Sequence, residues 1–281
     1  MNFWLYRAIF IKIRKKKKRN NFMKKTFLLL LLAAGTIFSV NAAEAEPFGM
    51  KQSTTATPRK DPNAETKEYW HKRWDARRKQ IAKGGIEIVL VGDSITHLWE
   101  SDPAKNKRKL GGIATYKKYF GKYNVLNLGY SGDRTEHTLW MTGDSKLLDN
   151  VNPKMVVVMI GTNNIGHKKA GVEATAAGIE LIIKNIRAKA PNAKIVLFAI
   201  FPRSPKANHP YRKQIADINK IICKFADNKD VFFCDITDKL LEKDGSLSPT
   251  IMPDYLHPND NGYEVWAQAI MPYVEKFVGK K

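Results

Sequence analysis

The chain has 281 residues, of which 43% are hydrophobic and 27% are charged. A chain of this length and composition can bury a full-sized core, so it is neither an intrinsically disordered tail nor a small disulfide-stabilised protein. Its formal net charge of +21 would indicate a nucleic-acid partner only if the basic residues gathered in the folded part of the chain.

Much of that charge lies in the first 45 residues. This stretch holds ten Lys and Arg but one acidic residue, Glu44. Two adjacent lysines precede an apolar run over 27–38, and three alanines follow it, which is the layout of a secretory signal peptide. The run is shorter than the roughly 20 apolar residues that cross a bilayer, so a permanent membrane anchor is disfavoured. We therefore expect 1–45 to be a signal peptide, with Met23 as an alternative translation start, and the mature protein to be periplasmic or secreted.

The next stretch, 46–63, is rich in Thr, Pro, Ala and Lys and shows no apolar period. We interpret it as an exposed linker, and we expect the folded domain to cover 64–281. In that domain Lys and Arg are interleaved with acidic and apolar residues. The remaining charge therefore indicates a solvated basic face, and no nucleic-acid partner is expected.

Short apolar runs rich in β-branched residues predict five buried strands. The predicted strands cover 86–91, 124–128, 155–160, 194–200 and 231–235. Helical patterns alternate with them, over 64–83, 135–148, 172–189, 211–226 and 261–278. Such alternation produces a parallel sheet, and right-handed crossovers place helices on both of its faces. The expected fold class is therefore α/β, as one three-layer domain.

Residues able to do chemistry follow three of these strands directly. Ser94 lies in Gly-Asp-Ser after the first strand, Gly129 ends Asn-Leu-Gly after the second, and Asn163 lies in Gly-Thr-Asn after the third. A further segment before the last helix contains Asp254 and His257. Because ligands of open parallel sheets bind at the carboxyl ends of the strands, we expect these segments to meet in one site.

Ser94, His257 and Asp254 have the residue types of a catalytic triad. A serine hydroxyl is a weak nucleophile that needs a base within hydrogen-bond reach, and His257 is the candidate base. Asp254 can accept a hydrogen bond from the second ring nitrogen and stabilise the imidazolium that forms. The three residues predict acyl transfer through a covalent intermediate on Ser94.

Three groups are candidate donors to the oxyanion of that reaction. They are the backbone N–H groups of Ser94 and Gly129 and the side-chain amide of Asn163. Each residue alone also fits a structural role, as a helix cap, a turn glycine or a loop residue. Their joint occurrence at successive strand ends favours the catalytic interpretation.

At these residues the sequence resembles the SGNH superfamily, the GDSL-type esterases and acylhydrolases. The four letters of that name are matched by Ser94, Gly129, Asn163 and His257. The stretches VGDSITHLW and NLGYSGDRTEHTLW are similar to the branch that contains the catalytic subunits of intracellular platelet-activating-factor acetylhydrolase. The resemblance implies a flavodoxin-like five-stranded parallel sheet, a Ser-His-Asp triad without a cofactor, and hydrolysis of short acyl esters. Asn164 departs from the wider family, which commonly has Asp there, and this puts in doubt the network that orients its neighbour.

Four further residues are candidates for substrate contact. Trp99, Tyr130 and Trp140 lie in or just beyond the catalytic segments, where bulky side chains could close an acyl pocket. Arg203, after the fourth strand, could meet an anionic substrate group.

The residues together predict an exported serine esterase that removes a short acyl group, such as acetyl, from a carbohydrate or a small-molecule ester. A phospholipid or lysophospholipid acylhydrolase uses the same mechanism and stays open as an alternative, since a single sequence does not show whether a long apolar groove exists. A basic binding protein for glycan or nucleic acid, on an inactive hydrolase scaffold, is the alternative from another class. The complete triad argues against it.

We expect neither a cofactor nor a metal, because no phosphate-binding glycine loop and no cluster of metal ligands is found in the sequence. The two cysteines, Cys223 and Cys234, fall in a predicted helix and a predicted strand. They could pair in an exported protein, but we favour two buried thiols.

Overall fold

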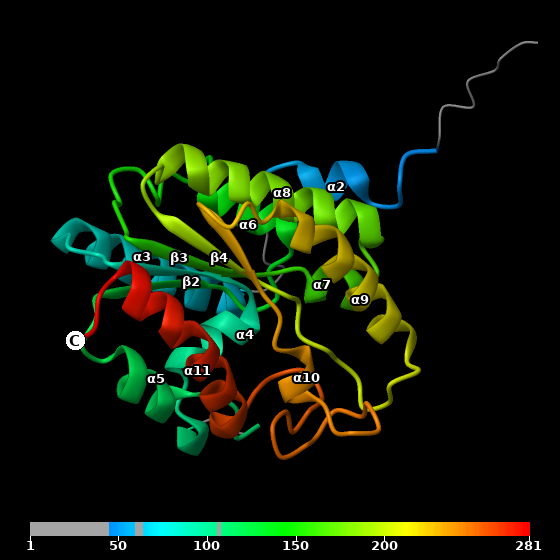
Figure 1. The fold of residues 1–281 in the computed structure, drawn as a ribbon. Helices are drawn as coiled ribbons and strands as arrows, with labels where there is room; N and C mark the ends of the chain where they lie inside the picture. The colour runs from blue at the N-terminus through cyan, green and yellow to red at the C-terminus, as the bar shows by residue number, and fades with distance from the viewer. Residues whose placement is uncertain (1–44, 60–63, 106–107) are drawn as a thin grey trace, which may run out of the picture. The chain divides into compact units, whose positions relative to one another are not determined.

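Five parallel strands form the centre of the molecule, in the order β2-β1-β3-β4-β5 (Figure 1). This computed structural model describes residues 45–59, 64–105 and 108–281. The order is that of a flavodoxin-like doubly wound sheet, which confirms the predicted fold class. The strands are β1 (Ile88–Gly92), β2 (Val125–Gly129), β3 (Met155–Met159), β4 (Lys194–Phe198) and β5 (Val231–Cys234).

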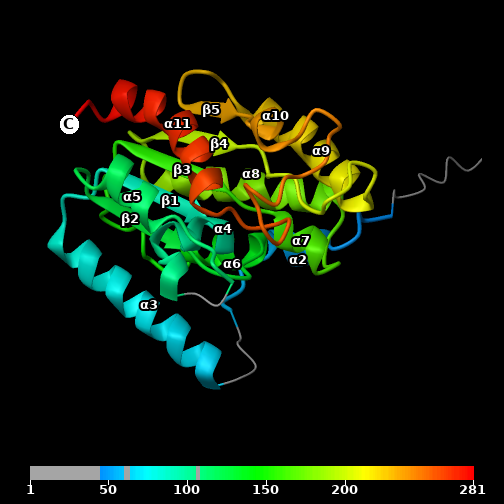
Figure 2. The same ribbon diagram turned by 90° about the horizontal axis from the view of Figure 1, so that it is seen from below.

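Helices cover both faces of the sheet (Figures 1 and 2). Side chains of α3, α6, α8 and α9 pack on one face, and those of α5, α10 and α11 pack on the other. The helices are α2 (Met50–Thr54), α3 (Ala64–Lys83), α4 (Ser94–His97), α5 (Ile113–Phe120), α6 (Thr135–Thr142), α7 (Thr162–Gly166), α8 (Val172–Lys189), α9 (Pro210–Ile222), α10 (Thr237–Leu240) and α11 (Asp260–Phe277). Short 3-10 turns cover Leu98–Glu100, Pro103–Lys105 and Cys223–Phe225.

The alternation of side chains along each strand divides the core into two layers. In β1, Val89 and Val91 pack with α6 and α8, whereas Ile88 and Leu90 pack with α5 and α11. Every residue of β1 is buried, because a central parallel strand is covered on both faces.

The strands that precede the predicted site end at the same level. Gly92, the last residue of β1, is in register with Gly129 of β2 and with Met159 of β3. The loops that follow these three strands therefore begin side by side at one edge of the sheet.

The predicted elements agree with the observed ones to within a few residues, with one exception. The helix predicted over 135–148 ends at Thr142, and turns follow it. The sequence patterns do not predict the shorter helices α2, α4, α5, α7 and α10. Cys223 and Cys234 are free thiols, and both are partly exposed rather than buried.

The interpretation of 46–63 as an exposed linker is wrong for its described part. Pro47 and the residues after it belong to the same compact unit as the rest of the domain. α2 packs against α6 and α8, and Ser53 is fully buried there. The Gly171 N–H donates to the Phe48 carbonyl at 2.8 Å. This segment is polar, but hydrogen bonds and close packing hold it against the domain. A search for periodic apolar residues does not detect such contacts.

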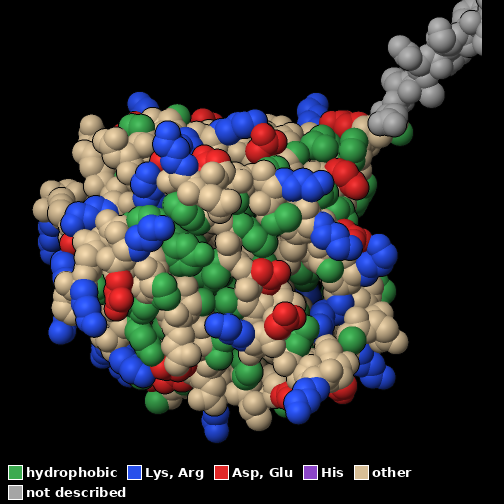
Figure 3. Space-filling model, in the orientation of Figure 1, with side chains coloured by type: hydrophobic (Ala, Val, Ile, Leu, Met, Phe, Trp, Pro, Cys, Tyr) green, Lys and Arg blue, Asp and Glu red, His purple; other side chains and the backbone are tan. Residues whose placement is uncertain are grey.

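The predicted signal peptide lies outside the described residues, apart from its last residue. Among the residues that the structure does describe, no helix is both long enough and apolar enough to cross a membrane. On the face seen in Figure 3, Lys and Arg are scattered among Asp and Glu, with apolar side chains between them.

Candidate active site

Ser94 lies where β1 passes into α4. The Asp93 carboxylate caps this short helix, because its Oδ1 accepts a hydrogen bond from the Ile95 N–H at 2.9 Å. A Cβ on Gly92 would lie 2.1 Å from Thr96 Oγ1 and 2.4 Å from the Met159 carbonyl oxygen, so the turn requires glycine. In the first turn of a helix the N–H groups have no intrahelical acceptor, so the Ser94 N–H is available to a ligand.

The three predicted triad residues form one chain of hydrogen bonds. Ser94 Oγ lies 2.9 Å from His257 Nε2, and His257 Nδ1 lies 2.8 Å from Asp254 Oδ2. Ser94 and His257 are 8% and 7% exposed, so the nucleophile and its base are almost enclosed by protein. The distances and the order of the groups are those that a serine nucleophile and its base require.

The pKa of Asp254 is shifted so that the side chain is ionised, as this chain of hydrogen bonds requires. Burial raises the pKa of Asp254, but the hydrogen bonds from His257 and from the Leu256 backbone outweigh it, and the net shift is downward. Asp254 Oδ1 also accepts the His257 N–H at 2.8 Å. The carboxylate therefore stays ionised near neutral pH, and it directs the second nitrogen of His257 toward Ser94.

Asn163 lies in the first turn of α7 and is 5% exposed. Its Nδ2 donates to the Asp133 carbonyl at 2.9 Å, in the loop after β2. An amide nitrogen carries two hydrogens, so one remains for a second acceptor.

The structure does not support Gly129 as an oxyanion donor. The Gly129 N–H already donates to Asn127 Oδ1 at 2.9 Å, inside its own strand. Glycine is needed there for packing, because a Cβ would lie 2.4 Å from the His97 backbone nitrogen. Gly132, three residues later, has a φ of 81° in a turn closed by the Asp133 N–H and the Tyr130 carbonyl. Its own N–H donates to no acceptor in the part of the chain that the structure describes.

Ser131, in the same loop, forms a second serine–histidine pair with His97 at the end of α4. Ser131 Oγ is 2.9 Å from His97 Nδ1, and the other ring nitrogen of His97 bonds the Tyr69 hydroxyl. Burial, together with the charges of Arg73 and Arg77, lowers the pKa of His97 to about 3, so this ring is neutral. Among the described residues no carboxylate orients the His97 ring, which distinguishes this pair from Ser94 and His257.

The sequence model of the GDSL-like lipase/acylhydrolase family matches residues 90–265, from β1 into α11. The chain belongs to this family. It is therefore an ester hydrolase, and the alternative of a binding protein on an inactive scaffold loses its support. The match includes Ser94, Asn163 and His257.

Two relatives of this acylhydrolase are subunits of platelet-activating factor acetylhydrolase IB. The alpha2 subunit of Rattus norvegicus is 32% identical over 178 residues, which cover 63% of this chain and 71% of the relative. The human alpha1 subunit is 30% identical over 185 residues, which cover 66% and 73%.

Solved structures share the fold. A GDSL-like lipase from Bacteroides thetaiotaomicron superposes with a TM-score of 0.54 at 20% identity, over 75% of this chain and 97% of the other. An acetyl xylan esterase superposes with a TM-score of 0.55 at 20% identity, over 67% of this chain and 100% of the other.

The predicted aromatic wall of the acyl pocket is wrong. Trp99 is fully buried in the layer that contains α11, with its ring centroid 5.0 Å from that of Trp266. Tyr130 and Trp140 pack in the opposite layer, 5.1 and 6.2 Å from Trp70. Because the sheet separates the two groups, these residues do not form one surface around Ser94.

Arg203 of the acylhydrolase supports the turn before Asn163. Its Nη1 donates to the Thr162 carbonyl at 3.0 Å, and its guanidinium carbon lies 5.1 Å from the ring centroid of Tyr211. A contact between Arg203 and an anionic substrate group stays a prediction.

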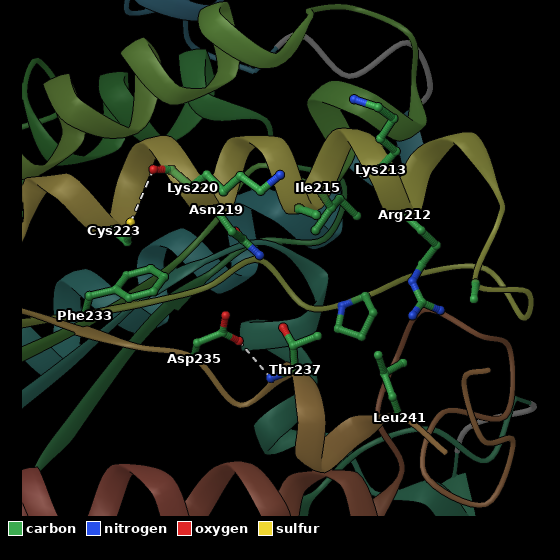
Figure 4. A pocket seen from close by; sticks show the side chains of 13 residues that line it. Arg212, Lys213, Ile215, Asn219, Lys220, Cys223, Phe233, Asp235, Thr237 and Leu241 are labelled. Atoms are coloured by element: carbon green, nitrogen blue, oxygen red, sulfur yellow. Dashed lines mark hydrogen bonds between the residues drawn. The ribbon is translucent and has the colours of Figure 1, made fainter. Parts of the chain in front are cut away.

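A groove of about 570 Å³ lies between α9 and the segment from β5 to α10 (Figure 4). The basic side chains that line it already have partners within the protein. Lys213 and Lys220 pair with Asp217 at 2.6 and 3.1 Å, and Arg212 donates to the Gly245 carbonyl at 2.9 Å. The triad residues of the acylhydrolase do not line this groove.

Asp133 is a buried carboxyl group in the loop that Asn163 contacts. Burial raises the pKa of Asp133 to about 8, although the Arg59 guanidinium, 3.2 Å away, opposes the rise. Asp93 and Glu136 add to the rise through their negative charges, and His137 Nδ1 lies 3.9 Å away. Asp133 therefore holds a proton in the native state at pH values where an ordinary aspartate has lost it.

We expect the stability of the Asp133→Asn variant to depend less on pH than that of the wild type. The native pKa of Asp133 lies above the ordinary value of 3.8, so the stability this group contributes is present at low pH and is lost as the pH rises to about 8. From about pH 5 to about pH 8 the free energy of unfolding of the wild type should fall relative to the variant, by at most about 1.4 kcal/mol per pH unit. Denaturant titrations at several pH values measure this difference, and parallel curves for the two proteins would refute it.

Proposed function

We propose that this acylhydrolase cleaves esters through an acyl-enzyme intermediate on Ser94. The observation that carries the proposal is the hydrogen-bonded chain from Ser94 Oγ to His257 Nε2 and from His257 Nδ1 to Asp254 Oδ2. Ser94 Oγ attacks the ester carbonyl carbon, and His257 takes the hydroxyl proton. His257 then gives that proton to the departing alcohol oxygen as the ester C–O bond breaks. Water, activated by the same histidine, releases the acid and restores Ser94.

Three donors would stabilise the negative oxygen of the tetrahedral intermediate. They are the Ser94 N–H, the second hydrogen of Asn163 Nδ2 and, in place of Gly129, the Gly132 N–H. The bond between Asn163 Nδ2 and the Asp133 carbonyl joins the amide to the loop that also carries Gly132, which supports this substitution.

The acyl group that fits this site best is short. Ser94, Asn163 and His257 are each at most 8% exposed, so little of the nucleophile and its partners is open to solvent. The relatives at 30% and 32% identity are named acetylhydrolases, and one structure with the same fold is an acetyl xylan esterase. We propose an acetyl ester of a carbohydrate or another small alcohol as the substrate.

An acetylated phospholipid is the second candidate. It is favoured by the identity to platelet-activating factor acetylhydrolase subunits. The two candidates share the acyl group and differ in the alcohol.

Acetyl esters should be cleaved at least about tenfold more efficiently than octanoyl esters of the same alcohol, which corresponds to about 1.4 kcal/mol. Each methylene that finds no pocket forfeits roughly 0.8 kcal/mol of burial, and forcing it into a packed site adds strain. The comparison is kcat/KM on 4-nitrophenyl acetate and 4-nitrophenyl octanoate. An equal or higher value on the octanoate would reject the short-acyl proposal and favour a long-chain acylhydrolase.

The substrate class is tested by measuring released acetate from acetylated xylan, acetylated monosaccharides and an acetylated phospholipid, with Ser94→Ala as the blank. Release from the carbohydrates alone supports the first candidate. Release from the phospholipid alone supports the second and overturns the first.

The N-terminal pattern supports a further proposal, that the domain is exported after removal of 1–45. The mature N-terminus, determined by mass spectrometry of protein from the native host, should lie shortly after the three alanines that end this stretch. A native protein that retains 27–38 would contradict removal.

A further inference from the structure

The segment Pro47–Arg59, here called the N-terminal arm, lies outside the stretch that the family model matches. It packs along α6 and α8, and Ser53 at its centre is fully buried. The Thr57 N–H donates to the Glu136 carbonyl at 3.0 Å. These contacts attach the arm to the domain and bring two of its polar residues, Ser53 and Arg59, toward the loops of the active site.

Ser53 contacts α7, the short helix that carries Asn163. The neighbouring Asn164 is fully buried, and its Nδ2 donates to Ser53 Oγ at 3.2 Å and to Thr135 Oγ1 at 2.8 Å. Asn164 Oδ1 accepts the Thr135 N–H at 3.0 Å, and Thr135 Oγ1 donates to the Ser53 carbonyl at 3.1 Å. An ionised aspartate at position 164 has no hydrogen to donate to either hydroxyl, so the arm and Asn164 complement each other.

Arg59 contacts the loop that carries Gly132. Its Nη1 donates to the Ser131 carbonyl and lies 3.2 Å from Asp133 Oδ1. The Asp133 backbone carbonyl accepts the hydrogen bond from Asn163 Nδ2. The guanidinium thus clamps the two residues that flank Gly132, and one of them also holds the Asn163 amide. The side chains of Arg59 and Asp133 are 19% and 3% exposed, so the pair is shielded from solvent.

We propose that the N-terminal arm is part of the catalytic architecture, with Arg59 and Ser53 as positioning residues for the two loops that supply oxyanion donors. Neither residue needs to touch the substrate: Arg59 acts through the backbone of 131–133, and Ser53 acts through Asn164. Because donors act on charge that develops only in the transition state, their displacement lowers kcat and leaves KM nearly unchanged. This inference rests on the proposed acyl-enzyme mechanism.

Replacing Arg59 by alanine should lower kcat on an acetyl ester roughly 10- to 100-fold, because a misplacement of about 1 Å costs up to about 100-fold. KM should change by less than about threefold, as expected when ground-state binding is retained. Added guanidinium, far below the molar concentrations that unfold proteins, should restore part of the lost kcat by occupying the vacated position. Arg59→Lys keeps the charge but loses the forked donors, so its loss should be smaller, roughly 3- to 10-fold.

Arg187→Ala is the matched control. Arg187 also lies 3.2 Å from an aspartate, Asp230, but that contact is at the amino end of β5, away from the catalytic loops. Its kcat should equal that of the wild type, and guanidinium should not raise it. Ser53→Ala tests the other contact of the arm and should lower kcat without changing KM.

Three outcomes would overturn the inference. One is a folded Arg59→Ala enzyme whose kcat is within about twofold of the wild type, a change worth less than 1 kcal/mol. Another is a loss that guanidinium does not reverse and that Arg187→Ala shares. The third applies if Arg59→Ala does not fold. In that case an Arg59→Lys enzyme with the kcat of the wild type would overturn the inference. Full activity in the Arg59 variants with none in Ser94→Ala would leave the proposed function standing, whereas an active Ser94→Ala enzyme would remove both proposals.

Discussion

Replacing Ser94 by alanine should lower the kcat of ester hydrolysis roughly a million-fold, the size of loss known when the nucleophile of a Ser-His-Asp unit is removed. Ser94 Oγ is hydrogen-bonded to His257, and His257 is oriented by Asp254. In the described part of the chain no other hydroxyl bonds a histidine that a carboxylate orients in this way. The measurement is steady-state hydrolysis of an acetyl ester by each purified variant, with the melting temperature as the test of folding.

Ser131→Ala provides a matched comparison for that result. Ser131 Oγ is also 2.9 Å from a histidine nitrogen, but its partner His97 bonds the Tyr69 hydroxyl instead of a carboxylate. We expect Ser131→Ala to keep most of its activity. Equal losses in the two variants would contradict a single nucleophile at Ser94.

The second large effect concerns His257 and Asp254, which should act as one unit. His257→Ala is expected to lose about as much activity as Ser94→Ala, and Asp254→Asn roughly 10⁴-fold. The double variant should be no worse than His257→Ala alone, because a carboxylate that orients an absent base has nothing left to stabilise. The kcat values of the wild type, the two single variants and the double variant form a mutant cycle that measures the coupling.

Asp235→Asn controls for damage to a strand-end loop. Asp235 Oδ1 accepts a backbone N–H at 2.8 Å, from Thr237, as Asp254 Oδ1 does from His257, but it orients no histidine. Its activity should stay at the wild-type level. Losses that simply multiply in the double variant would show that Asp254 and His257 act independently.

The sheet and its long helices could be predicted from the sequence because their signals are local. A strand such as β1, buried on both faces, is a continuous apolar run, and α8 and α11 carry a clear helical period. α2 has five residues, most of them polar, and it is stabilised by packing against α6 and α8. That kind of stabilisation comes from tertiary contacts, which a composition rich in Thr and Lys does not report.

The contact between the predicted triad residues could be anticipated from the sequence, because a parallel sheet gathers at one edge the segments that follow its strands. The prediction of Gly129 as an oxyanion donor failed because its N–H already donates to the Asn127 side chain. Whether a backbone N–H has an acceptor depends on the folded structure around it. The prediction for Trp99 failed because this residue lies in the 3-10 turn after α4, and its side chain packs in the core layer that contains α11. Arg59 was missed because 72 residues separate it from Ser131, and only the folded chain joins them.

The acyl-enzyme mechanism is tested most directly by mapping the adduct of an organophosphonate ester, which reacts with an activated serine as a substrate does. Peptide mass spectrometry of the inactivated wild-type protein should find one modified residue, Ser94, in step with the loss of activity. Labelling should be strongly slowed in His257→Ala, because the serine then lacks its base. An adduct on Ser131 or on any other residue, with Ser94 unmodified and activity lost, would contradict the account.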